Sequence, residues 1–328
     1  MHLLLALVAL ACPPETPDVG PLVRSLWLVQ RHGSPEALDP KNDQRVKAAL
    51  SKALAKDGVI TLKELGGFMQ PDTFGKLAGP DGSLNSDETM KLLDAATPES
   101  RAKLAPKLRA HADYLATTFD QIDPTRREAG EKLARWIAAN YRPGEPLHIT
   151  VVCTGNSRRS ILGSSMGNLA ASYYGMPEIR FHSGGTAPTA FNPRTVAALK
   201  SVGFEVEPTG KEAERGEPKT ENPVYRVSWG ESFETLEFSK HYGDKSNPQE
   251  GFAALMVCSE ADEGCPFVKG ASLRLSMPYL DPKIYDGGAY EGAKYAERRD
   301  DLGRLMLAVM VQARGLLASK ESSKPCRP

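Results

Sequence analysis

The chain has 328 residues, of which 41% are hydrophobic and 25% are charged, and its formal net charge at pH 7 is zero. This length allows two domains of ordinary size, and the composition is that of a soluble protein with packed cores. Because there is no excess of positive charge, neither nucleic acid nor an anionic membrane is indicated as a bulk partner. An anionic substrate must then be bound by local groups.

Residues 1–24 predict a signal segment followed by a linker. An apolar run over residues 3–11, too short to cross a bilayer, precedes Cys12 and a Pro-rich stretch. The small residues Ala9 and Ala11 stand before the cysteine, as at a lipoprotein cleavage site. We therefore expect an exported protein whose membrane contact is a lipid on Cys12. The alternative is a ragged N-terminus or a mistaken start, and then a cytoplasmic protein.

Residues 25–145 predict a mostly helical region, to which the sequence assigns no role. Residues 98–122 carry apolar side chains at helical spacing, and a second helix starts at Pro124 and stops before Pro143 and Gly144. Two stretches, KDGVITLKEL and PDGSLNSDET, resemble the second half of a calcium-binding loop. Their first two ligand positions lack carboxylates and hold Ala53, Ala55, Leu77 and Gly79.

A helix capping box explains the first of these stretches without calcium. Thr61 and Glu64 have its spacing, and Asn85 with Glu88 resembles one. We predict capped helical hairpins here, and no metal site or cofactor anywhere in the chain.

Residues 146–318 predict an α/β domain, and residues 319–328 form a polar tail. Strand patterns at 147–153, 179–185, 223–229, 252–258 and 271–277 are interleaved with helix patterns. Strands that alternate with helices favour a parallel sheet with helices on both faces. Active sites of such sheets lie beyond the carboxyl ends of the strands. Cys153 and Cys258 stand at the ends of two predicted strands, so we expect them at the active site. The charged stretch 207–223 predicts a loop near the site, either a lid or a solvated insertion.

The segment VVCTGNSRRS, residues 151–160, predicts an anion-binding loop between a strand and a helix. Gly155 is expected to let the backbone turn so that successive N–H groups point inward at the positive end of the helix. Arg159 can close the ring with a bidentate fork, and these positive surroundings favour the thiolate form of Cys153. Ser160 is placed to donate a hydrogen bond to the sulfur. The alternative is a buried structural cysteine at a strand end.

From about residue 146 to 317 the chain resembles the low-molecular-weight protein tyrosine phosphatase family, which includes the thioredoxin-coupled arsenate reductases. The loop above, the stretch SGGTAPTAFNPRTVAALKSVGF and the motif LDPK carry the resemblance. It implies that Cys153 is the nucleophile, Arg159 the oxyanion clamp, Asn156 a loop stabiliser and Asp281 the proton donor. The expected oxyanion-binding residues are Thr154, Gly155, Asn156, Ser157, Arg158 and Ser160.

The chain departs from the family's pattern at two places. Arg158 stands where relatives often have Cys, and Ser183-Gly184-Gly185 replaces Ser-Ala-Gly.

The segment VCSEADEGCPF favours the arsenate reductase branch. Cys258 and Cys265 match the second and third cysteines of that branch in spacing and wording. The implied chemistry is attack of Cys153 on arsenate, release of arsenite by Cys258, and transfer of the disulfide to Cys265 for reduction by an external, thioredoxin-like dithiol. With Cys12 and the tail residue Cys326 set aside, three cysteines remain, an odd number that argues for a free thiol.

Three alternatives stay open. The protein is a phosphatase that acts on phosphotyrosine or a small phosphate ester, as Tyr285 and Tyr290 after the acid loop favour. Cys258 and Cys265 form a structural disulfide. Or the protein is a lipoprotein that binds or senses an oxyanion without turnover.

Overall fold

A computed structural model describes residues 98–216, 219–264 and 267–322, together with residues 52, 56–65, 74–75, 78 and 80–85 of the N-terminal part. Within these residues, no helix combines the length and the apolarity needed to cross a bilayer. The predictions made for Cys12, Cys265, Cys326 and the calcium-like positions Ala53, Ala55, Leu77 and Gly79 lie outside the described residues.

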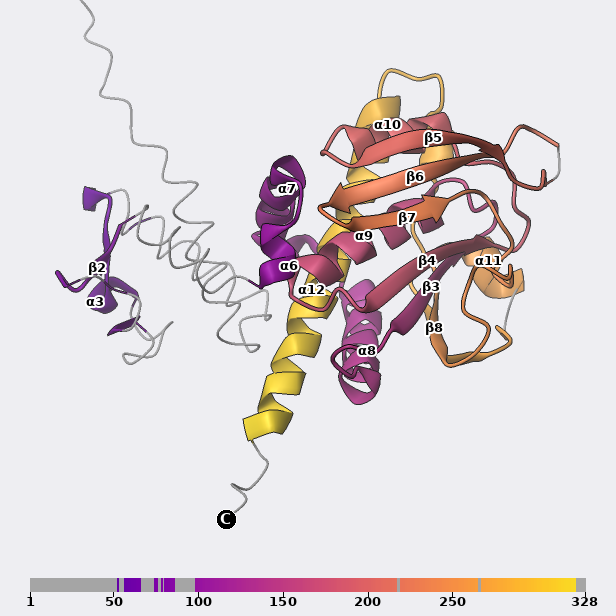
Figure 1. Cartoon of the computed structure of the whole chain (residues 1–328). Coiled ribbons are helices and arrows are strands. Elements are labelled where there is room, and N and C mark those ends of the chain that lie inside the picture. The colour runs from indigo at the N-terminus through magenta and orange to yellow at the C-terminus, as the bar shows by residue number, and fades with distance from the viewer. Residues whose placement is uncertain are drawn as a thin grey trace, which may run out of the picture.

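A four-stranded parallel sheet forms the centre of the fold (Figure 1). Its strands run in the order β4-β3-β8-β9 and coincide closely with the predicted ones. Their bounds are β3 Leu147–Cys153, β4 Ile179–Gly185, β8 Phe252–Met256 and β9 Ala271–Ser276. Because all four strands are parallel, their carboxyl ends meet at one edge, which is the edge where Cys153 lies. The prediction of a mixed α/β fold with a parallel sheet flanked by helices is confirmed.

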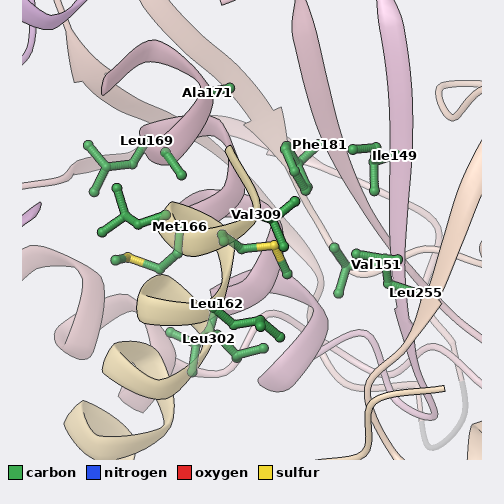
Figure 2. Packing of buried hydrophobic residues seen from close by; sticks show 14 of the residues in the cluster. Ile149, Val151, Leu162, Met166, Leu169, Ala171, Phe181, Leu255, Leu302 and Val309 are labelled. Atoms are coloured by element: carbon green, nitrogen blue, oxygen red, sulfur yellow. The ribbon is translucent and has the colours of Figure 1, made fainter. Parts of the chain in front are cut away.

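Helix α9, Arg159–Tyr173, follows β3 and is buried along its whole length. Its small residues allow it to lie directly on the sheet. A Cβ on Gly167 would come within 2.4 Å of the Phe181 ring, and one on Gly163 within 2.9 Å of Val151. Figure 2 shows Leu162 of α9 beside Leu302 of α12, with Val151 and Phe181 of the sheet among the same buried residues. This packing fixes the N-terminus of α9 at the end of β3.

The last helix, α12 (Glu291–Ser322), packs against α9 and against α7 and α8 of the helical region. Helices α7 (Pro106–Ala116) and α8 (Pro124–Asn140) contribute Leu108 and Leu133 to the same hydrophobic core as the sheet. Asp123 caps α8 by accepting from the N–H of Thr125. Residues 98–145 therefore share a core with residues 146–318.

The predicted helix over 98–122 is interrupted in the structure. It consists of α6 (Glu99–Ala102), α7 and the 3₁₀ turn η2 (Phe119–Gln121). The break comes at Ala105, whose backbone is extended because it precedes Pro106. The apolar spacing matches the buried positions of α7, and Pro106 separates α7 from α6.

A second, three-stranded antiparallel sheet was not predicted. It is formed by β5 (Glu205–Glu212), β6 (Pro223–Gly230) and β7 (Phe233–Glu237). The prediction of a loop over 207–223 is wrong for its first half, because β5 continues through Glu212 by pairing with β6. Most side chains of β5 are exposed, so the strand lacks the apolar signal that strand prediction depends on.

Three short helical elements complete the domain. They are α10 (Pro193–Lys200), α11 (Ser259–Gly264) and the 3₁₀ turn η3 (Pro282–Tyr285). In the N-terminal part, β1 (Ile60–Thr61) pairs with β2 (Ser83–Leu84), and α3 (Leu62–Leu65) follows β1. The Thr61–Glu64 capping box is present, since the N–H of Thr61 donates to Glu64 Oε2 at 3.0 Å and the N–H of Glu64 donates to Thr61 Oγ1 at 3.4 Å.

Candidate active site

Residues 154–158 form a loop whose N–H groups are unpaired and whose carbonyl groups are bonded away from the loop. The carbonyls of Cys153, Thr154, Gly155 and Ser157 accept from N–H groups in the segment 186–192. No described residue offers an acceptor to the N–H groups of residues 154–157. Successive N–H groups left in this way at the start of a helix are the arrangement by which backbone concavities bind anions. Anion binding by this loop stays a prediction.

The turn of the loop is made by Asn156 and not, as predicted, by Gly155. Asn156 has a φ of 39°, and asparagine tolerates this left-handed region because its short side chain can bond locally. Its Oδ1 accepts from the N–H of Lys240 at 2.7 Å, and its Nδ2 donates to Ser160 Oγ at 2.9 Å. The side chain thus holds both the loop and the start of α9.

Cys153 lies beneath the loop with 3% of its surface exposed, and its Sγ is 3.1 Å from Ser160 Oγ. The direction of this hydrogen bond follows from its neighbour. Because the Asn156 amide nitrogen can only donate, Ser160 Oγ accepts from it and its own hydrogen is available to the sulfur. A hydroxyl that donates to sulfur stabilises the thiolate.

Arg159 lies at the mouth of the loop and is 6% exposed. Its Nη1 donates to the carbonyl of Tyr279 and its Nη2 to Asp281 Oδ2, both at 2.8 Å. Its Nε is buried and has no hydrogen-bond partner among the described residues. A buried donor without a partner costs free energy, so this atom and the loop N–H groups are donors available to an anionic acceptor.

Asp281 stands directly before η3 and caps it by accepting from the N–H of Lys283 at 3.0 Å. Its other oxygen faces Arg159, and its Oδ1 is 4.0 Å from Arg158 Nε. The carboxyl group therefore lies at the mouth of the loop, where an oxygen leaving a bound oxyanion would need a proton.

Arg158 is tied to the start of the last helix. Its Nε donates to the hydroxyl of Tyr295 at 2.8 Å, and its Nη2 is 3.6 Å from Asp286. Arg194 of α10 lies 3.6 Å from the same carboxylate. Arg158 thus belongs to a charged network beside Asp281. It also lines the pocket described below.

Cys258 is a second buried free thiol at the same edge of the sheet. Val152 and Met256 are partners in the register of the neighbouring strands β3 and β8. Cys153 directly follows Val152, and Cys258 follows Met256 by two residues. Neighbouring strands lie about 4.8 Å apart. Cys258 Sγ contacts Thr154 Oγ1 at 3.4 Å. Burial raises the pKa of the Cys258 thiol above its usual value, although the hydrogen bond from Thr154 and the Arg159 charge oppose this.

The loop opens into a pocket of about 1000 Å³. One wall is apolar and includes Phe191 and Tyr225, whose rings meet edge to face with centroids 5.0 Å apart. Thr220 and Glu221, from the stretch predicted as a loop near the site, also line it. Sequence reasoning did not find Tyr225, because it reads as an ordinary strand residue until β6 is placed beside the pocket.

Comparison with known proteins gives no family assignment. No protein-family model matches the sequence, and no curated protein sequence matches it. Among solved structures, the chain is similar to a thioredoxin-dependent arsenate reductase of Corynebacterium glutamicum, with 17% sequence identity and a TM-score of 0.27 over 74% of this chain and 90% of that one. At that score the similarity carries no argument about function. Membership of the low-molecular-weight phosphatase family stays a prediction.

Several groups that hold the loop from behind were also missed. Ser239 Oγ donates to the carbonyl of Gly155 at 3.0 Å. Glu237 and Lys240 form a buried ion pair at 3.7 Å, and Ser183 donates to Glu237 at 2.7 Å. Ser183 belongs to β4, whereas Glu237, Ser239 and Lys240 come from the unpredicted antiparallel sheet or the segment after it, and no sequence signal marks these three. Within the described ranges, no three His, Cys, Asp or Glu side chains gather as a metal-binding set.

Proposed function

We propose that the protein is a cysteine-dependent enzyme that acts on a tetrahedral oxyanion. The observation that carries the proposal is the convergence at one loop of unpaired N–H groups, the buried and unpartnered Nε of Arg159, and Cys153 with a hydroxyl directed at its sulfur. The first two hold an anion, and the third places a nucleophile beneath it. Asp281 is the group positioned to protonate the departing oxygen.

We favour arsenate reduction as the reaction, because a second buried free thiol, Cys258, follows the strand that neighbours the strand of Cys153. The thiolate of Cys153 forms a bond to arsenic, and one arsenate oxygen leaves as water after protonation. Cys258 then attacks the sulfur of Cys153. The sulfur–arsenic bond breaks with its electron pair going to arsenic, so arsenic is reduced from +5 to +3 and leaves as arsenite, while the two sulfurs are joined in a disulfide.

Regeneration of the enzyme requires a further thiol. In the proposal Cys265 attacks Cys258 and releases the Cys153 thiol, leaving a Cys258–Cys265 disulfide that an external dithiol protein of the thioredoxin type reduces. Each exchange conserves electrons, and the external dithiol supplies the two that arsenic received.

A phosphatase reaction is the second candidate, and the pocket favours it. An inorganic oxyanion fills only a small part of about 1000 Å³, whereas the apolar wall with Phe191 and Tyr225 suits the organic group of a phosphate ester. In that reaction Cys153 attacks phosphorus, Asp281 protonates the alcohol or phenol that leaves, and water hydrolyses the phosphocysteine.

Three proteins separate the candidates: the wild type, Cys153→Ser and Cys258→Ser, each assayed for arsenite formation with a dithiol and for hydrolysis of an aryl phosphate. A reductase is expected to lose arsenite formation in both variants and any ester hydrolysis only in Cys153→Ser. Ester turnover without arsenite in the wild type would overturn the reductase in favour of the phosphatase. Phosphate binding without either reaction would overturn both and indicate an oxyanion sensor.

A further inference from the structure

A junction between Asn222 and Ser239 connects the antiparallel sheet to the loop of residues 154–158, here called the oxyanion loop. Asn222 directly precedes β6, and Ser239 lies two residues after the end of β7. The two residues are 0% and 2% exposed. Asn222 Oδ1 accepts from the N–H of Ser239 at 3.0 Å, and its Nδ2 donates to the carbonyl of Ser239 at 2.7 Å. The side-chain amide thereby pairs with both backbone groups of one residue, as a strand partner would, and fixes that residue.

Ser239 in turn holds the loop by its side chain. Its Oγ donates to the carbonyl of Gly155 at 3.0 Å and accepts from the N–H of Thr189 at 3.0 Å. Because the carbonyl of Gly155 is held outward, the neighbouring N–H groups remain directed toward the anion.

The residue after Ser239 sets the orientation of the groups around the nucleophile. The N–H of Lys240 donates to Asn156 Oδ1, which fixes which end of the Asn156 amide faces Ser160. With the amide nitrogen turned to Ser160, the serine hydroxyl can donate only to Cys153 Sγ. If the amide turned over, its oxygen would compete for that hydrogen and the sulfur would lose its donor.

We propose that Asn222 and Ser239 are positioning residues for the oxyanion loop, through which the antiparallel sheet sets the hydrogen bond that Ser160 makes to Cys153. The inference rests on the proposed function, since it supposes that the loop binds an oxyanion over an ionised sulfur. Neither residue touches the substrate. Asn222 acts on the loop through the backbone of residues 239 and 240, and Ser239 acts through its own hydroxyl on the carbonyl of Gly155.

Other charged groups that face Cys153 stay constant in the test. Arg159 of α9 and Cys258 after β8 lie beside it, and Glu260 and Asp281 act through Arg159, at 4.0 Å and 2.8 Å from its Nη2. Asn222 and Ser239 contact none of these groups in the hydrogen bonds described above, so their removal changes the hydrogen bonds of the loop and leaves the charges in place.

The test compares the full chain with Asn222→Ala, Ser239→Ala and a matched control, Ser228→Ala. Ser228 lies in the same antiparallel sheet, and its hydroxyl makes a long 3.4 Å contact with Gly230 away from the loop. Two quantities are measured for each protein: the midpoint of the pH profile of Cys153 alkylation by iodoacetamide, followed on the Cys153 peptide by mass spectrometry, and the dissociation constant of inorganic phosphate.

In Asn222→Ala and Ser239→Ala we expect the alkylation midpoint to move to higher pH and phosphate to bind about 5 to 20 times more weakly, the loss of about one or two hydrogen bonds. Ser228→Ala is expected to match the wild type. A purely structural role would lower the melting temperature and leave both quantities unchanged in the folded protein, and that result would overturn the proposal. Ser239→Thr keeps the hydroxyl and is expected to restore phosphate binding. If Asn222→Ala fails to fold, the smaller change Ser239→Ala decides the question by the same two measurements.

Failure of the proposed function gives a different result. The wild type itself would then bind no phosphate and alkylate like an ordinary thiol. A wild type that binds phosphate, with variants that bind it equally well, overturns the positioning role alone.

Discussion

Asp281 and an oxyanion compete for the same guanidinium. The carboxylate of Asp281 accepts from Arg159 Nη2 at 2.8 Å. Of the Nε and Nη2 pair on one side of the guanidinium, only Nε is then free for a ligand. A bidentate contact with an anion through Nε and Nη2 therefore requires the carboxylate to move or to become protonated. Asp281 is thus expected to weaken the binding of an oxyanion and to assist the chemical step.

Replacing the carboxylate separates these two effects. In Asp281→Asn we expect inorganic phosphate to bind several-fold more tightly, because a competing negative charge is gone. Turnover should fall by about 10² to 10⁴, because the proton donor is gone. Phosphate titration measures the affinity, and steady-state kinetics of arsenite formation and of aryl phosphate hydrolysis measure the turnover. Weaker phosphate binding in this variant would contradict the competition. Ile284→Ala controls for disturbance of the turn, because Ile284 lies in η3, is exposed and does not line the pocket.

The buried thiol of Cys258 predicts a pH dependence for disulfide formation. Since burial holds the pKa of this thiol above its ordinary value, Cys258 is a neutral thiol at pH 7. Only the thiolate attacks, so the rate of the Cys153–Cys258 step should rise with pH, up to about tenfold per unit while the thiol is still mostly protonated.

Rapid quenching of the reduced protein mixed with arsenate, followed by peptide mass spectrometry, measures this rate between pH 6.5 and 8.5. A rate that stays flat or falls as the pH rises would contradict the assignment of Cys258 as the attacking group.

At the scale of elements, sequence pattern predicted the parallel sheet nearly to the residue and missed the antiparallel one. Strands β3 and β8 are largely apolar runs, β4 ends in two glycines, and β9 alternates apolar with polar residues. Helices separate β3 from β4 and β8 from β9, so the pattern of these strands is plain. Strand β5 is exposed along most of its length, and β7 is short. Their pairing depends on partners distant in the sequence, which periodicity does not report. Cys153 and Arg159 could be named from the segment 151–160, and Asp281 from the resemblance. Asn222 and Ser239 could not be named, because their contacts with the loop depend on the antiparallel sheet.

The segment after β7 also explains why glycine is needed at position 184. A Cβ on Gly184 would lie 2.5 Å from Cα of Tyr242, a backbone atom that cannot turn aside. One on Gly185 would lie 2.6 Å from the carbonyl oxygen of Thr154. The first contact comes from the segment after β7 and the second from the loop of residues 154–158.

We therefore expect Gly184→Ala to destabilise the protein by about 1 to 3 kcal/mol, the usual cost of overpacking. Denaturant unfolding measures the change. Gly292→Ala is the matched control, since a Cβ there meets no atom within 4 Å and the residue lies in the first turn of α12. Equal stability of the two variants would show that the Tyr242 backbone yields without cost.

The helical region and the sheet form one core at the scale of the whole molecule. Leu108 of α7 and Leu133 of α8 are fully buried with Leu302 of α12, which itself packs on α9. Removal of residues 1–145 would expose this apolar face of α12, although the loop and all strands of both larger sheets would remain.

A fragment that starts at residue 146 is accordingly expected to aggregate or to unfold without a cooperative transition, whereas one that starts at residue 98 keeps every helix of that core. Circular dichroism during thermal unfolding, with light scattering, compares the two. Cooperative unfolding of the shorter fragment at the same temperature would contradict the shared core.

The central claim is that the loop after β3 holds an oxyanion above the sulfur of Cys153. The most direct measurement is a crystal structure of the reduced protein with arsenate or phosphate. We predict a tetrahedral anion bound by the N–H groups of residues 154–159 and by Arg159 Nε, with Cys153 Sγ beneath it in line for attack. An anion bound elsewhere, with Arg159 still paired to Asp281 and the loop N–H groups filled by protein or water, would contradict the account.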